Sequence, residues 1–149
     1  MRDQKFGIEI EMTGLTRGAA AQVLAGHFHT EAVHVGGGYD TYTVRDGQNR
    51  QWKLVSDASI DCQTRGSRTA GTAYSVEFVS PICKYEDIET IQECIRKLRQ
   101  AGARVNSSCG IHVHVDAAPH TPQTLHNLVN IMAAKEDLLY KALQIEVSR

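Results

Sequence analysis

Apolar residues occupy every second position in residues 6–12, where a glycine and two glutamates fill the positions between them. This alternation predicts a strand with one buried face and one polar face. Residues 41–44 and 51–55 predict two more strands, joined by a polar turn that contains an Asp-Gly pair. Residues 74–79 predict a fourth strand, and Pro81 ends it because proline cannot continue a hydrogen-bonded ladder.

Two stretches between these strands have helical character. Residues 17–28 are rich in alanine and follow Thr16, a suitable N-terminal cap. Residues 85–101 carry isoleucine and leucine at helical spacing, have two acidic residues in the first turn and stop before Gly102. We therefore expect two amphipathic helices inserted between strands.

The last third of the chain predicts one strand and one helix. Residues 111–116 alternate aliphatic side chains with two histidines and an aspartate. A helix then begins at Thr121 and Pro122, a cap followed by proline at the first helical position. Its apolar spacing continues towards Arg149 without a stop signal. We therefore expect residues 1–149 to form one domain, the N-terminal part of a longer protein.

This order of elements predicts an α+β fold. Neighbouring strands joined by a hairpin and short connections favour an antiparallel or mixed sheet, with helices packed on one face. The chain has 149 residues and 42% hydrophobic residues, which is enough for one hydrophobic core. A glycine run at residues 36–38 lacks the lysine of a phosphate-binding loop, so we interpret it as a break between elements.

Composition narrows the classes of partner. Sixteen basic and seventeen acidic side chains give a net charge of −1, which argues against a general nucleic-acid or anionic-membrane binder. No apolar run approaches the roughly 18 residues of a membrane span. The N-terminus enters the first strand directly, so we expect no signal peptide and a cytoplasmic location. The four cysteines form no C-x-x-C pair and are interpreted as reduced thiols.

The polar face of the first strand carries the first candidate chemistry. Glu9 and Glu11 lie two positions apart, so their Cα atoms are about 6.5–7 Å apart on the same side. Two carboxylates this close repel each other unless a cation lies between them or one is protonated. A solvated sheet face is the alternative interpretation, and it applies equally to Glu77 in the fourth strand.

The last strand presents His112 and His114 on one side, at a spacing that suits a metal ion or a metal with a neighbouring phosphate. Two half-exposed histidines without a ligand are the alternative. Cys109 and the two histidines would supply three zinc ligands, but the sequence indicates no fourth. Carboxylates on neighbouring strands favour Mg²⁺ or Mn²⁺ instead, because these ions prefer oxygen ligands.

Two polar loops add weaker candidates. Asp57 and Ser59 follow the hairpin and are consistent with either a simple turn or a polar clamp that binds substrate. Arg65 and Arg68 lie in a loop from which they could reach a phosphate, although solvated surface cations are the simpler interpretation.

Four of these segments, in this order, resemble the amidoligases of the carboxylate–amine ligase superfamily, which includes glutamine synthetase and glutamate–cysteine ligase. The resemblance extends over about residues 6–145, and the four motifs together are far more specific than any one of them. The motifs are Phe-Gly-Ile-Glu-Ile-Glu-Met (6–12), Trp52 with Asp57-Ala-Ser59, Val-Glu-Phe-Val-Ser-Pro (76–81) and Cys-Gly-Ile-His-Val-His-Val (109–115).

The resemblance implies a glutamine synthetase-like catalytic sheet and an ATP- and Mg²⁺-dependent ligase. Such enzymes phosphorylate a carboxylate donor, and an amine acceptor attacks the acyl phosphate. A homo-oligomer is compatible with it, because superfamily members often build sites between subunits. By similarity, Glu11 and Glu77 would share one metal, Glu9 and His112 would bind a second, and His114 would approach the ATP phosphates. Asp57 and Ser59 are assigned to substrate binding. From their loop position, Arg65 and Arg68 are assigned to nucleotide binding.

Superfamily members carry further acids and cations beyond the His-x-His strand, so we expect the residues in this chain to be a partial set. A second subunit or a downstream segment would complete the site. Two alternatives remain: a non-catalytic module of the same fold that binds nucleotide or peptide, and a metal-dependent hydrolase that activates water.

Overall fold

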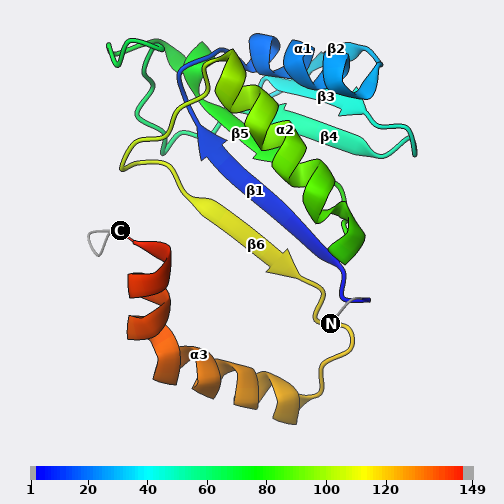
Figure 1. Ribbon diagram of the computed structural model, residues 1–149, viewed down its shortest axis with the longest axis vertical. Coiled ribbons are helices and arrows are strands. Elements are labelled where there is room, and N and C mark those ends of the chain that lie inside the picture. Colours follow the sequence, from blue (N-terminus) through cyan, green and yellow to red (C-terminus); the bar gives the residue numbers. More distant parts are fainter. Residues whose placement is uncertain (1–2, 146–149) are drawn as a thin grey trace. The chain divides into compact units, whose positions relative to one another are not determined.

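The computed structural model describes residues 3–145, whose elements are labelled in Figure 1. The chain divides into two compact units, residues 1–115 and 116–149. The first unit contains β1 (Phe6–Met12), α1 (Arg17–Phe28), β2 (Ala32–Gly36), β3 (Thr41–Arg45), β4 (Gln51–Val55), the short 3₁₀ helix η1 (Thr72–Tyr74), β5 (Val76–Val79), the 3₁₀ turn η2 (Tyr85–Asp87), α2 (Ile88–Ala101) and β6 (Ile111–Val115). The second contains α3 (Pro122–Leu143).

The strands of the first unit form one antiparallel sheet in the order β2-β3-β4-β5-β1-β6. Strand β1 therefore lies between β5 and β6, although these two strands come much later in the chain (Figure 1). The expected α+β fold with an antiparallel sheet is confirmed. A specific likeness to the glutamine synthetase sheet stays a prediction.

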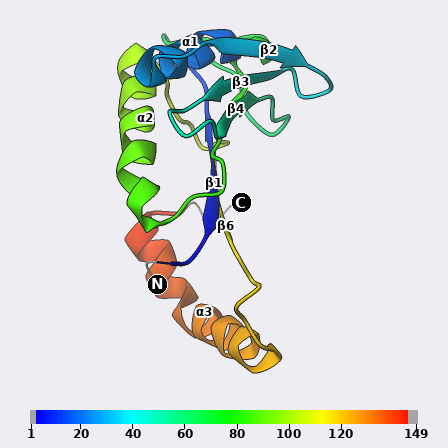
Figure 2. The ribbon, with the colours of Figure 1, turned by 90° about the vertical axis from the view of Figure 1, so that its right-hand side faces the viewer.

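The hydrophobic core lies between one face of this sheet and helices α1 and α2. Trp52 of β4 and Phe78 of β5 are fully buried there, beside Leu24 of α1 and Leu98 of α2. Figure 2 shows both helices beside the sheet in a second view. Because side chains alternate along a strand, burying the even-numbered residues of β1 places Glu9 and Glu11 on the opposite face.

The β3–β4 hairpin is anchored by a buried carboxylate. Asp46 Oδ1 accepts hydrogen bonds from the backbone N–H groups of Gln48 and Arg50, at 2.9 and 3.0 Å. Its Oδ2 accepts from Arg50 Nε at 2.8 Å and from the indole N–H of Trp52 at 3.0 Å. Burial raises the pKa of Asp46, but these hydrogen bonds, led by that of Trp52, outweigh it and hold the pKa below its usual value.

Most of the predicted elements are confirmed at or near their expected bounds. Thr16 caps α1 by accepting a hydrogen bond from the Ala19 N–H at 3.2 Å, and Gly102 ends α2 in the left-handed conformation. Thr121 caps α3 and Pro122 begins it, as predicted, and Thr124 completes a capping box with Thr121.

One missed strand and three boundaries differ from the predictions. Helix α2 begins at Ile88, since the 3₁₀ turn η2 occupies Tyr85–Asp87. Strand β2 was not predicted, because His34 and the glycines around it lack the alternation of a half-buried strand. Strand β5 begins at Val76, since a 3₁₀ turn occupies Thr72–Tyr74. Helix α3 does not continue towards Arg149: Gln144 adopts a left-handed conformation (φ 54°) that ends it, and residues 146–149 lie outside the described part. Among residues 3–145, no helix has both the length and the apolar character needed to cross a membrane.

Candidate metal-binding site

The register of three adjacent strands brings the predicted site residues onto one face. Glu11 of β1 lies directly opposite Glu77 of β5, and Glu9 lies opposite His112 of β6. His114 lies opposite Gly7, which has no side chain to fill the space beside the imidazole. Strand alternation, which the sequence predicts, and the register of the sheet, which the structure shows, therefore place acids and imidazoles together.

Two sets of three side chains in the described part of the chain could each hold a metal ion. Glu9, Glu77 and His112 each offer one ligand atom within 4.8 Å of the others, and so do Glu11, Asp57 and Glu77. We call them the outer group (Glu9, Glu77, His112) and the inner group (Glu11, Asp57, Glu77). Glu77 belongs to both, so the two groups adjoin and share one carboxylate.

The inner group is the less exposed of the two, with Glu11 buried and Asp57 and Glu77 half-buried. Glu11 is only 3% exposed, and its Oε2 accepts a hydrogen bond from the Gly110 N–H at 2.6 Å. Burial raises the pKa of Glu77, and the nearby charges of Glu9, Asp57 and Glu11 raise it further. A bound cation would stabilise such an accumulation of negative charge.

The outer group is more open and contains the imidazole of His112, and His114 lies beside it. The carboxylate oxygen Glu9 Oε2 lies 3.1 Å from His114 Nε2 and 3.3 Å from His112 Nδ1. The hydrogen bond with His114 is the main cause that lowers the pKa of Glu9; burial opposes it, and His112 adds to the lowering. The histidine side chains are 53% and 64% exposed for His112 and His114, so both are accessible to a ligand in solution.

Two loops border the inner group and are tied to each other. The Asp61 N–H donates to Ser108 Oγ at 2.8 Å, and the Asn106 side chain donates to the Asp61 carbonyl at the same distance. Asp57 Oδ1 accepts from both the N–H and the hydroxyl of Ser59, at 2.7 and 2.5 Å. Ser59 therefore supports the Asp57 carboxylate, and the loop connections hold this border in place.

The donor set fits a hard divalent cation. Four carboxylates and one imidazole make up the two groups, and oxygen-rich sets of this kind suit Mg²⁺ or Mn²⁺. Cys109 belongs to neither group; its thiol is within 3.6 Å of Asn106 Oδ1 instead. The zinc alternative therefore loses the sulfur ligand on which it depended.

The structure brings Asp57 into the inner group, although its sequence pattern predicted substrate binding. Nothing in the spacing of the chain indicates this, because Asp57 comes from a loop whose path the sequence does not specify. The substrate roles of Asp57 and Ser59 stay predictions, as do the metal roles of the four strand residues and the phosphate role of His114.

Arg65 and Arg68 are not part of either group. The Arg65 side chain packs against Gly102, and its backbone carbonyl accepts a hydrogen bond from the Arg104 side chain. Arg68 lies on the same loop, exposed to solvent, and its carbonyl accepts from the Thr64 N–H at 2.8 Å. Their predicted part in nucleotide binding stays a prediction.

A comparison with protein-family models identifies the family of the chain. Residues 2–149 match the family model described as "Putative amidoligase enzyme". No curated protein and no solved structure gave a match. The family model covers nearly the whole length of the chain, including every residue of the two groups. The chain therefore belongs to the amidoligase family.

Proposed function

We propose that this chain carries the metal- and nucleotide-binding face of an ATP-dependent ligase that joins a carboxylate donor to an amine acceptor through an acyl phosphate. One observation carries the proposal: two adjoining groups of hard ligands share Glu77 on a single sheet face. A family whose activity is amide-bond formation needs a way to hold phosphate groups together with their counter-ions. Two neighbouring cation sites meet that need.

Bound Mg²⁺ or Mn²⁺ would neutralise the phosphate oxygens of ATP during phosphoryl transfer. The residues of this chain have distinct parts in that arrangement. The inner group, with its buried Glu11, holds one cation at a fixed position, and the outer group holds the second nearer to solvent. His114, exposed and hydrogen-bonded to Glu9, is placed to donate to a phosphate oxygen.

A calorimetric titration with Mn²⁺ tests the proposal, carried out with and without a non-hydrolysable ATP analogue. We expect two cations to bind and the nucleotide analogue to strengthen their binding, because phosphate oxygens complete the coordination that three protein ligands leave open. Two Mn²⁺ ions whose binding the analogue does not change would contradict a ligase. That result would favour the metal-dependent hydrolase, which needs no nucleotide.

The two groups should also be separable by substitution. We expect Asp57→Asn to weaken Mn²⁺ binding at the inner group, and His112→Ala to weaken it at the outer group. Each loss should be at least the roughly 10–100-fold that removal of an outer-shell partner causes, because a direct ligand is removed. Each variant removes one ligand and leaves the other group's three ligands in place. Mn²⁺ electron paramagnetic resonance counts the bound ions at each concentration. Loss of both ions in both variants would show that the groups do not act as two sites.

His126→Ala is a matched control for the histidine substitution. His126 lies on α3 within the second unit and belongs to neither group. We expect Mn²⁺ binding by this variant to equal that of the wild type.

A further inference from the structure

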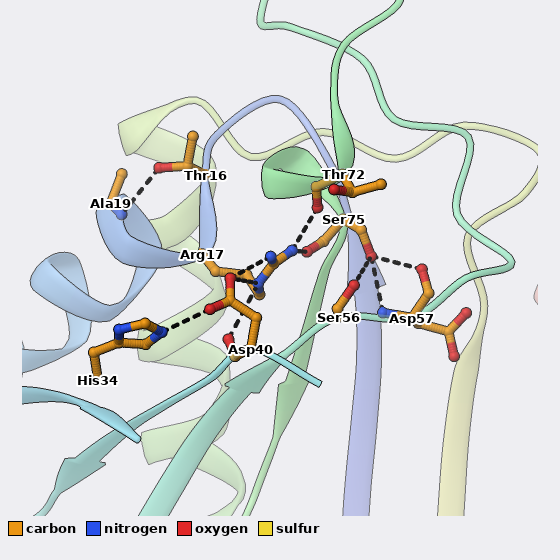
Figure 3. A network of polar contacts seen from close by, with 9 residues as sticks. All are labelled: Thr16, Arg17, Ala19, His34, Asp40, Ser56, Asp57, Thr72 and Ser75. Atoms are coloured by element: carbon orange, nitrogen blue, oxygen red, sulfur yellow. Dashed lines mark hydrogen bonds and ion pairs between the residues drawn. The ribbon is translucent and has the colours of Figure 1, made fainter. Parts of the chain in front are cut away.

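Asp57 differs from the other members of the inner group in having no strand to hold it. It follows β4 by two residues, at the start of a long loop. Its peptide groups are nevertheless fixed by one side chain: the Asp57 N–H donates to Ser75 Oγ at 2.8 Å, and the Ser75 hydroxyl donates to the Asp57 carbonyl at 2.6 Å. A single hydroxyl therefore holds the backbone of Asp57 on both sides (Figure 3).

Ser75 is itself tied to the inner group through the chain. It is 2% exposed and lies two residues before Glu77, directly before β5. The positions of the Glu77 carboxylate and of the Asp57 backbone therefore both depend on the short segment 75–77. A displacement of Ser75 would move one ligand of the inner group relative to the other two.

Arg17 holds Ser75 from the opposite side. Its guanidinium, on a residue only 5% exposed, donates from Nη1 to the carbonyl of Ser75 at 2.6 Å and to that of Thr72 at 2.5 Å. Nη2 and Nε donate to Asp40 Oδ2, at 2.5 and 3.2 Å, and Asp40 Oδ1 lies 2.6 Å from His34 Nε2. Figure 3 shows this chain of contacts running from His34 to Asp57.

A buried guanidinium is costly unless its N–H groups donate hydrogen bonds. The Arg17 guanidinium makes five such contacts, to the carbonyls of Thr72, Ser75 and Asp40 and to the Asp40 carboxylate. The Arg17 side chain therefore fixes the turn that precedes β5, and with it the direction in which the Ser75 hydroxyl points. Arg17 contacts no residue of the two metal groups in these hydrogen bonds, so its connection to the inner group runs through Ser75.

We propose that Ser75, supported by Arg17, is a positioning residue that sets the cation affinity of the inner group by fixing Asp57. This inference rests on the proposed function, because it assumes that the inner group binds a cation. Partners that orient a metal ligand typically contribute about 10–100-fold in metal affinity, and Ser75 would act in this way without touching the ion.

Ser75→Ala tests the inference with two measurements on the full chain. Amide hydrogen exchange of Asp57 reports the positioning itself, without metal, and we expect it to become at least about tenfold faster because its acceptor is gone. A Mn²⁺ titration reports the consequence: the inner ion should bind about 10–100-fold more weakly, while the outer ion binds as in the wild type.

Two control variants separate positioning from general destabilisation. Ser56→Ala removes a neighbouring hydroxyl whose hydrogen bond to Ser75 Oγ is long, at 3.5 Å, and therefore weak, so both measurements should stay unchanged. Leu24→Ala removes a fully buried core side chain of α1 and should lower thermal stability without changing the number or affinity of bound ions.

The outcomes distinguish the two proposals. Two ions in the wild type, with selective weakening of the inner one in Ser75→Ala, support the inference. Two ions bound with equal affinity in both proteins overturn it and leave the proposed function intact. A wild-type protein that binds no Mn²⁺ in the presence or absence of the nucleotide analogue overturns both.

Discussion

Replacing Glu77 with glutamine is expected to abolish binding of both cations and, at the same time, to stabilise the metal-free protein. Both cations are lost because Glu77 is the one ligand that the inner and outer groups share. The gain arises because Glu77 lies directly opposite Glu11 and near Glu9 and Asp57, so a neutral side chain removes repulsion. Relief of one like-charged cross-strand pair is worth about 0.2–1 kcal/mol. Mn²⁺ titration and urea unfolding measure the two effects.

The pH dependence of this stabilisation has a definite sign. The pKa of Glu77 is raised in the folded protein by burial and by the neighbouring carboxylates, so its ionised form lowers stability. As pH falls through that raised pKa, wild-type Glu77 becomes protonated and the advantage of Glu77→Gln should disappear.

Glu89→Gln is the matched control, since it removes one negative charge from α2 at a side chain that is 70% exposed. It should change neither Mn²⁺ binding nor, by more than about 0.5 kcal/mol, the free energy of unfolding. A Glu77→Gln variant that retains two tightly bound ions would contradict the shared-ligand arrangement.

Asp46→Asn is expected to lower the free energy of unfolding by about 3 kcal/mol, because it leaves buried donors without an acceptor. The wild-type carboxylate accepts four hydrogen bonds, two of them at Oδ2 from Arg50 Nε and the Trp52 indole. An amide can accept at one end only, so either orientation turns an NH₂ group towards two donors. Urea unfolding at neutral pH measures the difference.

The pH profile checks the cause. Hydrogen bonds hold the pKa of Asp46 below its usual value, so its contribution is complete above the unfolded value of about 3.9 and is lost as pH falls through the lower folded pKa. The difference between wild type and Asp46→Asn should therefore shrink across that acidic range. A difference that stays constant there would show that the carboxylate charge is not responsible. Asp137→Asn makes the same change on α3, outside the core, and serves as the control.

The sequence predicted the parts of the fold that depend on local alternation and on capping. Strand β1, the β3–β4 hairpin and helix α2 follow from period and turn chemistry, and the opposite faces of β1 follow directly from its alternation. The pairing of Glu11 with Glu77 was expected only if the strands share a sheet, and the register shows that they do.

The remaining features depend on tertiary contacts that no local pattern records. Strand β2 is mostly exposed and pairs only with β3, so its residues show no buried face to detect. Asp57 joins the inner group because Ser75 and Arg17, 18 and 40 residues away respectively, hold its loop. Nothing in the sequence around Ser75 or Arg17 indicates that these residues position the Asp57 loop.

The placement of β1 between β5 and β6 has a consequence for how the chain tolerates length changes. Loss of one residue inside β1 would exchange its two faces, sending Glu9 and Glu11 into the core and exposing its apolar side chains. The packing of the core and the arrangement of the metal ligands would both be lost. An extra residue in the β3–β4 turn would disturb the hydrogen bonds of Asp46 but leave the ligand positions in place, because β3 and β4 carry no member of the two groups. Metal binding should therefore survive a change of length at that turn, at a cost in stability, and be lost with a change of length within β1.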